Sequence, residues 1–257
     1  MTESSVPNSA RIWNYWLGGT DNYPVDRAAG EQYRQVFPGI VDVARASRQF
    51  LTRAVGYLAG EAGIRQFLDV GAGLPTADNT HEVAQRAALE SRIVYVDNDP
   101  LVQAHARALL TSSAEGATSY VDADLREPDR ILAAAAETLD LARPVALMLM
   151  GVLGHVGDYQ QAQAVVRRLL APLPPGSYLV LNDGTDTVDP VFAEAQRRYN
   201  ESGAVPYHLR SPAQVAGFFE GLELVEPGVV PVPHWRPAGG DGPPAEVDAF
   251  GGVGRKP

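Results

Sequence analysis

Three aspartates follow three short apolar segments of the chain, at positions that could serve a nucleoside. Asp69 stands just before the turn Gly71-Ala72-Gly73. Asp97 and Asp124 follow the second and third apolar segments. A carboxylate can accept hydrogen bonds from both hydroxyls of a ribose, and such charge-assisted bonds are strong. One such aspartate alone is more often a solvated loop residue or a helix cap, but three at consecutive strand ends predict a nucleoside-binding site.

The turn Gly71-Ala72-Gly73 is expected to join a strand to a helix. Glycine lets the backbone approach a ligand closely, and the following helix offers unpaired N–H groups to an anion. A dinucleotide-binding turn would carry a third glycine at position 76, but Thr76 stands there, preceded by Pro75, which disfavours a pyrophosphate and therefore NAD. The carboxylate of a methionine moiety demands less of the turn. The cofactor contacts predicted here are Asp69, Gly71, Ala72, Gly73, Pro75 and Thr76.

The second and third strand ends supply the rest of the predicted cofactor site. Asp97 lies where a carboxylate can accept both ribose hydroxyls. Asp124, preferred over Asp122, can accept from an adenine amino group while a neighbouring backbone N–H reaches a ring nitrogen. The contacts predicted from these two ends are Asp97, Asn98, Asp124 and Leu125.

Apolar runs alternate with amphipathic helical patterns along most of the chain, as in a parallel sheet covered on both faces. The expected strands are residues 66–70, 93–96, 118–121, 144–150, 177–181, 222–232 and 247–253. The expected helices are residues 45–62, 78–89, 100–110, 129–141, 159–170, 191–200 and 212–221. Residues 233–244 are rich in proline and glycine and are expected to form a loop. The fold class is therefore α/β.

The N-terminal segment does not follow this alternation and is rich in aromatic residues. We expect residues 1–44 to form a helical cap over the ligand edge of the sheet and residues 45–257 to form the binding domain. Tyr15, Trp16 and Tyr23 are candidates for the substrate site, because aromatic rings can face a cation or an aromatic ligand. The equal alternative is an arm that only packs.

Several stretches of the chain follow one family pattern. They are RIWNYWLGG at 11–19, DNY at 21–23, QFLDVGAGLPT at 66–76, VYVDNDP at 94–100, ADLR at 123–126, FF at 218–219, PG at 227–228 and GVGRK at 252–256. In these motifs the chain resembles the S-adenosylmethionine (SAM)-dependent methyltransferase family once catalogued as the domain of unknown function DUF574. The resemblance implies a class I, Rossmann-like fold with a seven-stranded, mostly parallel sheet, an antiparallel last strand and helices on both faces. It also implies SAM as cofactor and S-adenosylhomocysteine (SAH) as product.

The loops after the fourth and fifth strands are where an acceptor should approach. His155 could act as a base near neutral pH, and Asp183 is the second candidate for catalysis. Asn182 could orient the acceptor. The more ordinary alternatives are a histidine bonded to loop backbone and an Asp183-Gly184 turn. The chain departs from the family pattern at Asn14, Gly154 and Asn182-Asp183, which leaves the acceptor open.

Composition narrows the class of partner. The formal net charge is −10 and Lys256 is the only lysine, which disfavours nucleic acid. The absence of cysteine excludes disulfides, thiolate metal sites and a cysteine nucleophile. Asp97-Asn98-Asp99 lacks the ligand spacing of a calcium loop, so no metal is predicted. A polar N-terminus and the lack of a long apolar run predict a cytoplasmic protein that does not bind a membrane.

These observations favour methyl transfer from SAM to a small-molecule acceptor, by a monomer or a homodimer. Two alternatives stay open. One is a non-catalytic protein that binds SAM or SAH, and the other is an enzyme that uses SAM for non-methyl chemistry.

Overall fold

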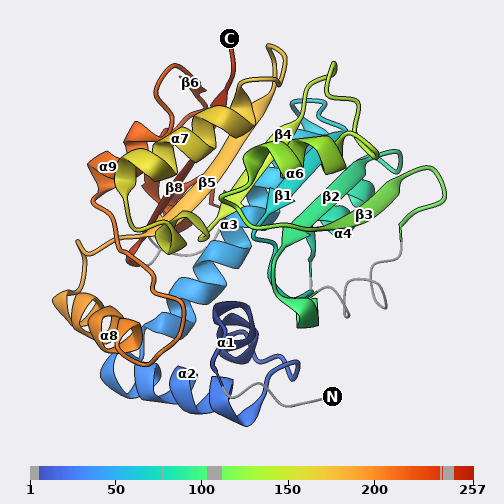
Figure 1. Ribbon diagram of the computed structural model, residues 1–257. Coiled ribbons are helices and arrows are strands. Elements are labelled where there is room, and N and C mark those ends of the chain that lie inside the picture. Colours follow the sequence, from blue (N-terminus) through green and yellow to red (C-terminus); the bar gives the residue numbers. More distant parts are fainter. Residues whose placement is uncertain (1–5, 77, 103–111, 238, 240–245) are drawn as a thin grey trace.

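The fold is built around one twisted sheet, seen in a computed structural model that describes residues 6–76, 78–102, 112–237, 239 and 246–257 (Figure 1). The strand order is β3-β2-β1-β4-β5-β8-β6, with β7 also paired to β8. Strands β1 to β5 run parallel, and β8 is antiparallel to β5, β6 and β7. The parallel strands therefore end together at one edge of the sheet.

The bounds of the elements are as follows. The strands are β1 Gln66–Val70, β2 Arg92–Asp97, β3 Ala117–Asp122, β4 Ala146–Met150, β5 Tyr178–Gly184, β6 Glu223–Leu224, β7 Val230–Pro231 and β8 Ala249–Arg255. The helices are α1 Ser9–Trp16, α2 Pro24–Val36, α3 Ile40–Gly60, α4 Thr80–Ala87, α6 Pro128–Ala135, α7 Tyr159–Leu170, α8 Pro190–Asn200 and α9 Pro212–Gly217, with 3₁₀ turns η1 Leu153–His155 and η2 Val232–His234.

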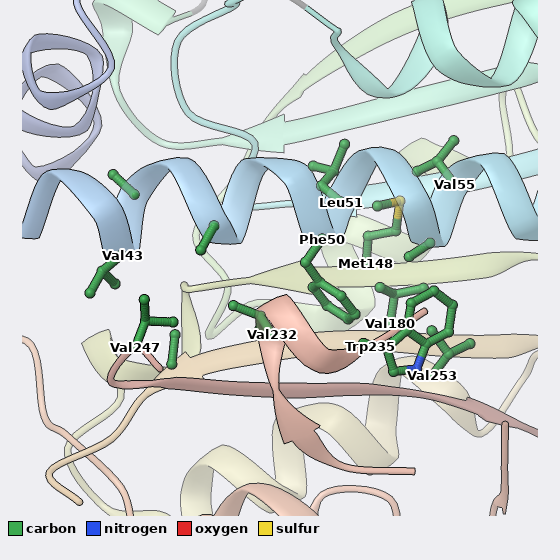
Figure 2. Packing of buried hydrophobic residues seen from close by; sticks show 14 of the residues in the cluster. Val43, Phe50, Leu51, Val55, Met148, Val180, Val232, Trp235, Val247 and Val253 are labelled. Carbon is green, nitrogen blue, oxygen red and sulfur yellow. The ribbon is translucent and has the colours of Figure 1, made fainter. Parts of the chain in front are cut away.

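Neighbouring residues of each buried strand enter two different cores, because side chains alternate across a sheet. In β1, Phe67 belongs to the core under α3, whereas Leu68 belongs to the core under α6, α7 and α9. Figure 2 shows Phe50 of α3 close to Met148 and to Trp235, which directly follows η2. Phe50 and Trp235 meet edge to face at 5.4 Å between ring centroids. The sheet is thus covered on both faces.

Most predicted elements are present with small changes in their bounds. The predictions for β1 and α7 match residue for residue. Helix α3 begins at Ile40, earlier than predicted, because residues 40–44 continue its buried stripe. The helix predicted at 100–110 lies mostly outside the described residues, and so does part of the loop predicted at 233–244.

The strand predicted at 222–232 was wrong in one respect, since it is split into β6 and β7. Between them Pro227 has no N–H for a ladder, and Gly228 has φ +90°. Both short strands pair with β8. The sheet of the described residues therefore has seven strand positions along its path and an eighth short strand beside β8.

Helices α1 and α2 lie together with α8 at the end of the sheet where the parallel strands finish (Figure 1). Helix α3 runs without a break through residue 45 and links this group to the sheet. The division of the chain at residue 44 stays a prediction. Across the described residues, no helix combines the length and hydrophobicity that a bilayer span requires.

Candidate functional site

A cavity of about 220 Å³ opens at the carboxyl ends of the parallel strands, beneath α1 and beside α3. Residues from β1, β2, β4 and β5 line it, together with residues 123–126, which directly follow β3. Of the residues predicted from sequence, those that line this cavity are Asp69, Gly71, Ala72, Gly73, Thr76, Asp97, Asn98, Asp124, Leu125, His155 and Asn182. The structure therefore brings most of the predicted cofactor set together.

The glycine turn has a backbone that other residues would strain. Gly71 has φ +76° and Gly73 has φ +66°. A Cβ added at Gly71 would lie 2.3 Å from the Val152 side chain, which is too close for any pair of carbon atoms. The N–H groups of Gly71 and Ala72 donate to the Val96 carbonyl at 2.8 and 3.1 Å, so the turn is held against β2.

Asp97 connects this turn to the end of β2. Its Oδ2 accepts from the Gly73 N–H at 2.8 Å, and its Oδ1 accepts from the Asp99 N–H at 3.0 Å. Burial raises the pKa of Asp97, and these backbone hydrogen bonds oppose that shift. Each oxygen keeps a second lone pair, so the carboxylate can still accept hydrogen bonds from a ligand in the cavity.

Asp69 is a second carboxylate that lines the cavity, and it is buried. Its Oδ2 accepts from the Thr80 hydroxyl at 2.6 Å. Burial raises the pKa of Asp69 to about 6, while Thr80 and the positive charge of Arg48 oppose the rise. Arg48 projects from α3, lines the same cavity and donates to the Asp78 carbonyl at 3.0 Å. A cation and a titratable carboxyl therefore lie side by side near the glycine turn.

Asp124 forms the rim of the cavity at the end of β3. It accepts from the Asn98 amide at 3.2 Å and from the Arg126 N–H at 2.8 Å. The Arg126 guanidinium contacts the same carboxylate at 3.2 Å and also donates to the His155 carbonyl at 2.7 Å. Arg126 thereby ties the rim of β3 to η1, across the cavity.

His155 lies on the β4 side of the cavity. Its Nδ1 is 3.0 Å from the Pro206 carbonyl, and because a carbonyl only accepts, this nitrogen carries the proton. Burial lowers the pKa of His155, and the charge of Arg126 lowers it further. The neutral ring consequently has Nε2 as an acceptor, the state that a general base requires.

Asp183 lies outside the residues that line the cavity. It is fully buried and pairs with Arg210 at 2.7 Å. The Tyr207 hydroxyl donates to its other oxygen. Burial raises the pKa of Asp183, and Arg210 opposes that shift. This geometry gives Asp183 a supporting position and does not support the direct catalytic role predicted from sequence.

The aromatic residues predicted for the substrate site separate into two groups. Tyr15 donates to Glu31 at 3.1 Å, and Tyr23 lies under the Arg11 guanidinium, 5.2 Å from ring centroid to Cζ. Neither lines the main cavity or the second pocket described below. Trp16 lines a second, smaller pocket beside the first. Pro75 lines a small hollow behind the glycine turn and does not face the main cavity.

The second pocket has a volume of about 40 Å³ and lies between α1, α2, α3, α8 and the end of β5. Trp16 and Asn182 are the two predicted residues that line it. Asn182 also lines the main cavity, and its amide donates to the Ser47 hydroxyl at 3.1 Å. Asn182 therefore stands at the seam between the two spaces.

Sequence reasoning missed several residues of the two sites. On α3, Ala44, Ser47, Arg48 and Leu51 share one face and line the main cavity. Their spacing of three and four residues was a usable signal, because two polar side chains interrupt an otherwise apolar stripe. Tyr207 could not have been found in this way, since it lies in a loop without periodicity.

Arg11 was also missed, and it links the cap to the nucleoside side of the cavity. It is buried, and it pairs with Asp26 of α2 at 2.8 Å and with Asp99 at 3.0 Å. Asp99 in turn donates its N–H to Asp97. In the described part of the chain no group of three or more histidine or acidic side chains is arranged to hold a metal ion.

The family of S-adenosyl methyltransferases matches residues 1–257 of the chain. A DUF574 family protein from Streptomyces avermitilis has a similar structure at 47% identity, with a TM-score of 0.95 and 99% of each chain covered. A protein from Thermobifida fusca is 39% identical, with a TM-score of 0.91 and coverage of 99% of this chain and 96% of the other.

More distant structures agree in fold alone. The N-methyltransferase NodS from Bradyrhizobium japonicum has a TM-score of 0.52 at 18% identity, over 83% of this chain and 96% of its own. The class I fold is thus shared with proteins of quite different sequence. A separate search of curated protein sequences gave no match.

Proposed function

The chain belongs to the S-adenosyl methyltransferase family, whose cofactor is SAM, and from that membership we propose that it transfers the methyl group of SAM to a small-molecule acceptor. The observation that carries the proposal is the single cavity that collects Asp97, Asp124, the glycine turn and His155. Its cofactor side and its β4 and β5 side are continuous, as a transfer between two bound molecules requires.

The residues of the cavity fit the chemical groups of SAM. Asp97 keeps acceptor capacity for ribose hydroxyls, and the rim at Asp124 and Leu125 offers a carboxylate and a backbone N–H to an adenine. The glycine turn leaves room beside Val152 that a Cβ would fill. Arg48 supplies a cation for the methionine carboxylate. These roles are proposed for Asp69, Gly71, Ala72, Gly73, Thr76, Asp97, Asn98, Asp124 and Leu125.

SAM supplies an activated methyl group, so the protein has mainly to position the acceptor and remove its proton. His155 is the proposed base, because its pKa is lowered and its Nε2 is left to accept a proton. Asn182 is the proposed orienting residue at the seam of the two pockets. Asp183 is proposed to act at a distance, by holding Tyr207 and Arg210 in place.

Calorimetric titration with SAH, SAM and NAD tests the cofactor assignment. We expect SAH and SAM to bind and NAD to give no heat. Asp97→Asn keeps the shape of the side chain but removes its charge, and should weaken SAH binding by about 1.5–3 kcal/mol, or roughly 10- to 150-fold. The matched control is Asp122→Asn, an exposed aspartate at the end of β3.

Equal SAH affinity in both variants would remove Asp97 from the site, and binding of NAD in place of SAH would overturn the proposal. A screen of small acceptors for SAH release then tests turnover. His155→Ala should slow that turnover by about 10²- to 10⁴-fold if it is the base, with SAH affinity unchanged. Binding of SAH without turnover on any acceptor would instead favour a non-catalytic SAM-binding protein.

A further inference from the structure

The second pocket opens beside the proposed cofactor cavity and shares part of its wall. The residues common to both are Ser9, Trp13, Ser47, Gly151 and Asn182. They come from α1, α3, the loop after β4 and the end of β5, so a molecule in one space touches the wall of the other. A ligand of the second pocket therefore lies next to whatever the main cavity holds.

The wall of this pocket carries no charged side chain among the residues that line it. Its aromatic members are Trp13, Trp16, Tyr33, Phe192, Tyr199 and Tyr207. Trp16 and Tyr33 meet edge to face at 5.2 Å, and Tyr33 meets Tyr199 at 6.1 Å. Burying a charge here without a partner would cost much more than burying an apolar ring. The pocket selects an uncharged and largely apolar molecule.

Two of the residues that line this pocket have a buried oxygen with no hydrogen-bond partner among the described residues. These oxygens are Oδ1 of Asn182 and the hydroxyl of Tyr199. The other tyrosine hydroxyls on the wall are used, since Tyr33 donates to Gln196 at 3.1 Å and Tyr207 donates to Asp183. Burying a polar group without a hydrogen bond is costly, so two such groups on residues that line one pocket point to a polar group on a ligand.

The size of the pocket restricts the ligand further. One water needs roughly 10–15 Å³ of such a space, and the pocket measures about 40 Å³. This is the space of about three to four waters, so the pocket has room for one end of a molecule whose remainder extends into the main cavity.

We propose that this pocket holds the hydroxyl end of the acceptor, and that the acceptor is an uncharged aromatic molecule whose ring lies against the wall shared with the main cavity and whose hydroxyl group meets Asn182 and Tyr199. The proposal rests on the proposed methyltransferase function for the identity of the neighbouring ligand. The chemistry of the pocket wall, in contrast, defines the ligand class by itself.

Three probes of similar shape test separately the ring, the hydroxyl group and the absence of charge. Phenol has a ring and a hydroxyl, toluene has the ring alone, and benzoate has the ring and a charge. Ligand-detected NMR titrations on the full chain, saturated with SAH, measure the affinity of each. We expect phenol to bind about threefold to tenfold tighter than toluene, the value of one hydrogen bond. Benzoate should bind weakest.

Tyr199→Phe removes one of the unpartnered hydroxyls and keeps the ring. It should weaken the binding of phenol by about threefold to tenfold and leave the binding of toluene unchanged. Tyr178→Phe is the control, because Tyr178 is a similarly buried tyrosine at the opposite end of β5. It should leave all three affinities as they are.

Equal binding of phenol and toluene, tight binding of benzoate, or no binding of any probe would overturn the proposal. So would an equal effect of the two tyrosine variants. SAH binding is measured in the same samples without probe. Its absence would defeat the proposed function, while a preference for phenol over toluene and benzoate would still support the ligand class of the pocket.

Discussion

The two halves of the site are built by different means. The half over β1, β2 and β3, which is the proposed cofactor half, consists of backbone N–H groups, glycines and carboxylates that lie within a few residues of their strand ends. The half over β4 and β5, which is the proposed acceptor half, consists of side chains drawn from α1, α2, α8 and the loop that carries Tyr207. The first half is therefore nearly complete in short segments of sequence, and the second exists only after the cap has packed.

Tyr207 shows what the second half depends on. Its hydroxyl bonds Asp183 and accepts from the Gly184 N–H at 3.0 Å. Its ring meets the His155 ring edge to face at 5.2 Å and lies where a Cβ on Gly154 would fall. Asp183, Gly154 and His155 thus all contact one aromatic side chain, so this half of the site is held together as a packed unit.

The largest effects are expected from the two buried arginines, one in each half. Arg11→Met leaves Asp26 and Asp99 without their cation, and Arg210→Met does the same to Asp183. An uncompensated buried charge costs about 3–5 kcal/mol of unfolding free energy. Urea unfolding should show this loss in both variants. Arg197→Met, which breaks exposed ion pairs, is the control and should change little.

SAH affinity distinguishes the two arginines. It should fall in Arg11→Met by about tenfold, a factor equal to roughly 1.4 kcal/mol, because Asp99 orders the Asp97 carboxylate. It should change much less in Arg210→Met, whose partner Asp183 does not line the main cavity. An equal loss of SAH affinity in both would mean that the halves are not separable.

The next effect is a pH dependence that belongs to the cofactor half. The pKa of Asp69 is raised by burial to about 6, above its unfolded value, so the folded chain binds this proton more tightly. Its contribution to stability is present at pH below about 4 and is lost as pH rises through 6, on the order of 3 kcal/mol in all. The difference in unfolding free energy between wild type and Asp69→Asn should follow this curve. A flat difference between pH 4 and 7 would contradict it.

A pair of glycines sharpens the comparison at a smaller scale. Gly71→Ala puts a Cβ against Val152 at a residue with positive φ, which costs about 1–2 kcal/mol in strain before any clash. Gly154→Ala puts a Cβ 2.4 Å from the Tyr207 ring, with a cost of about 1–3 kcal/mol if the ring must move.

The two alanine variants should affect different ligands. Titration should show that Gly71→Ala weakens the binding of SAH and that Gly154→Ala weakens the binding of phenol. Gly56→Ala is the control, because this glycine lies within α3 and has open space at its Cβ; it should stabilise the helix and leave both ligands unaffected. A loss of SAH affinity in Gly154→Ala would contradict the division.

The same division explains what the sequence could predict. The alternation of apolar runs and the turn at Gly71-Ala72-Gly73 depend on local spacing, so β1 and the residues around Asp97 were predicted correctly in position. Asp183 was predicted as catalytic from its place at a strand end. Its partners Tyr207 and Arg210 lie 24 and 27 residues away in the chain, and no local pattern reports that they bury it.

Tyr15, Trp16 and Tyr23 show the same limit within the cap. They are close in sequence and of similar chemistry, yet of the three only Trp16 lines the second pocket, and none lines the main cavity. The choice depends on how α1 and α2 pack on each other: Tyr15 turns to Glu31 of α2, and Tyr23 lies at the start of that helix under Arg11. Helical periodicity shows which residues share one face of a helix. It shows what a residue contacts only when the element that packs against that face is known.

The smallest effect is expected at the seam, where the two halves meet. Ser47→Ala removes the hydroxyl that accepts from the Asn182 amide at 3.1 Å. One such hydrogen bond contributes about 0.5–1.5 kcal/mol, so the loss of stability should be near the limit of a denaturation experiment. Thr52→Ala, on the same helix and away from both pockets, is the matched control.

Binding reports this change better than stability does. Ser47 and Asn182 line both spaces, and an Asn182 side chain without its partner is free to turn. Both SAH and phenol should therefore weaken by about twofold to tenfold, the range for one hydrogen bond. If only phenol weakens, Asn182 serves the acceptor half alone. A loss in both would make the Ser47–Asn182 hydrogen bond the contact through which the packed acceptor half and the locally encoded cofactor half are coupled.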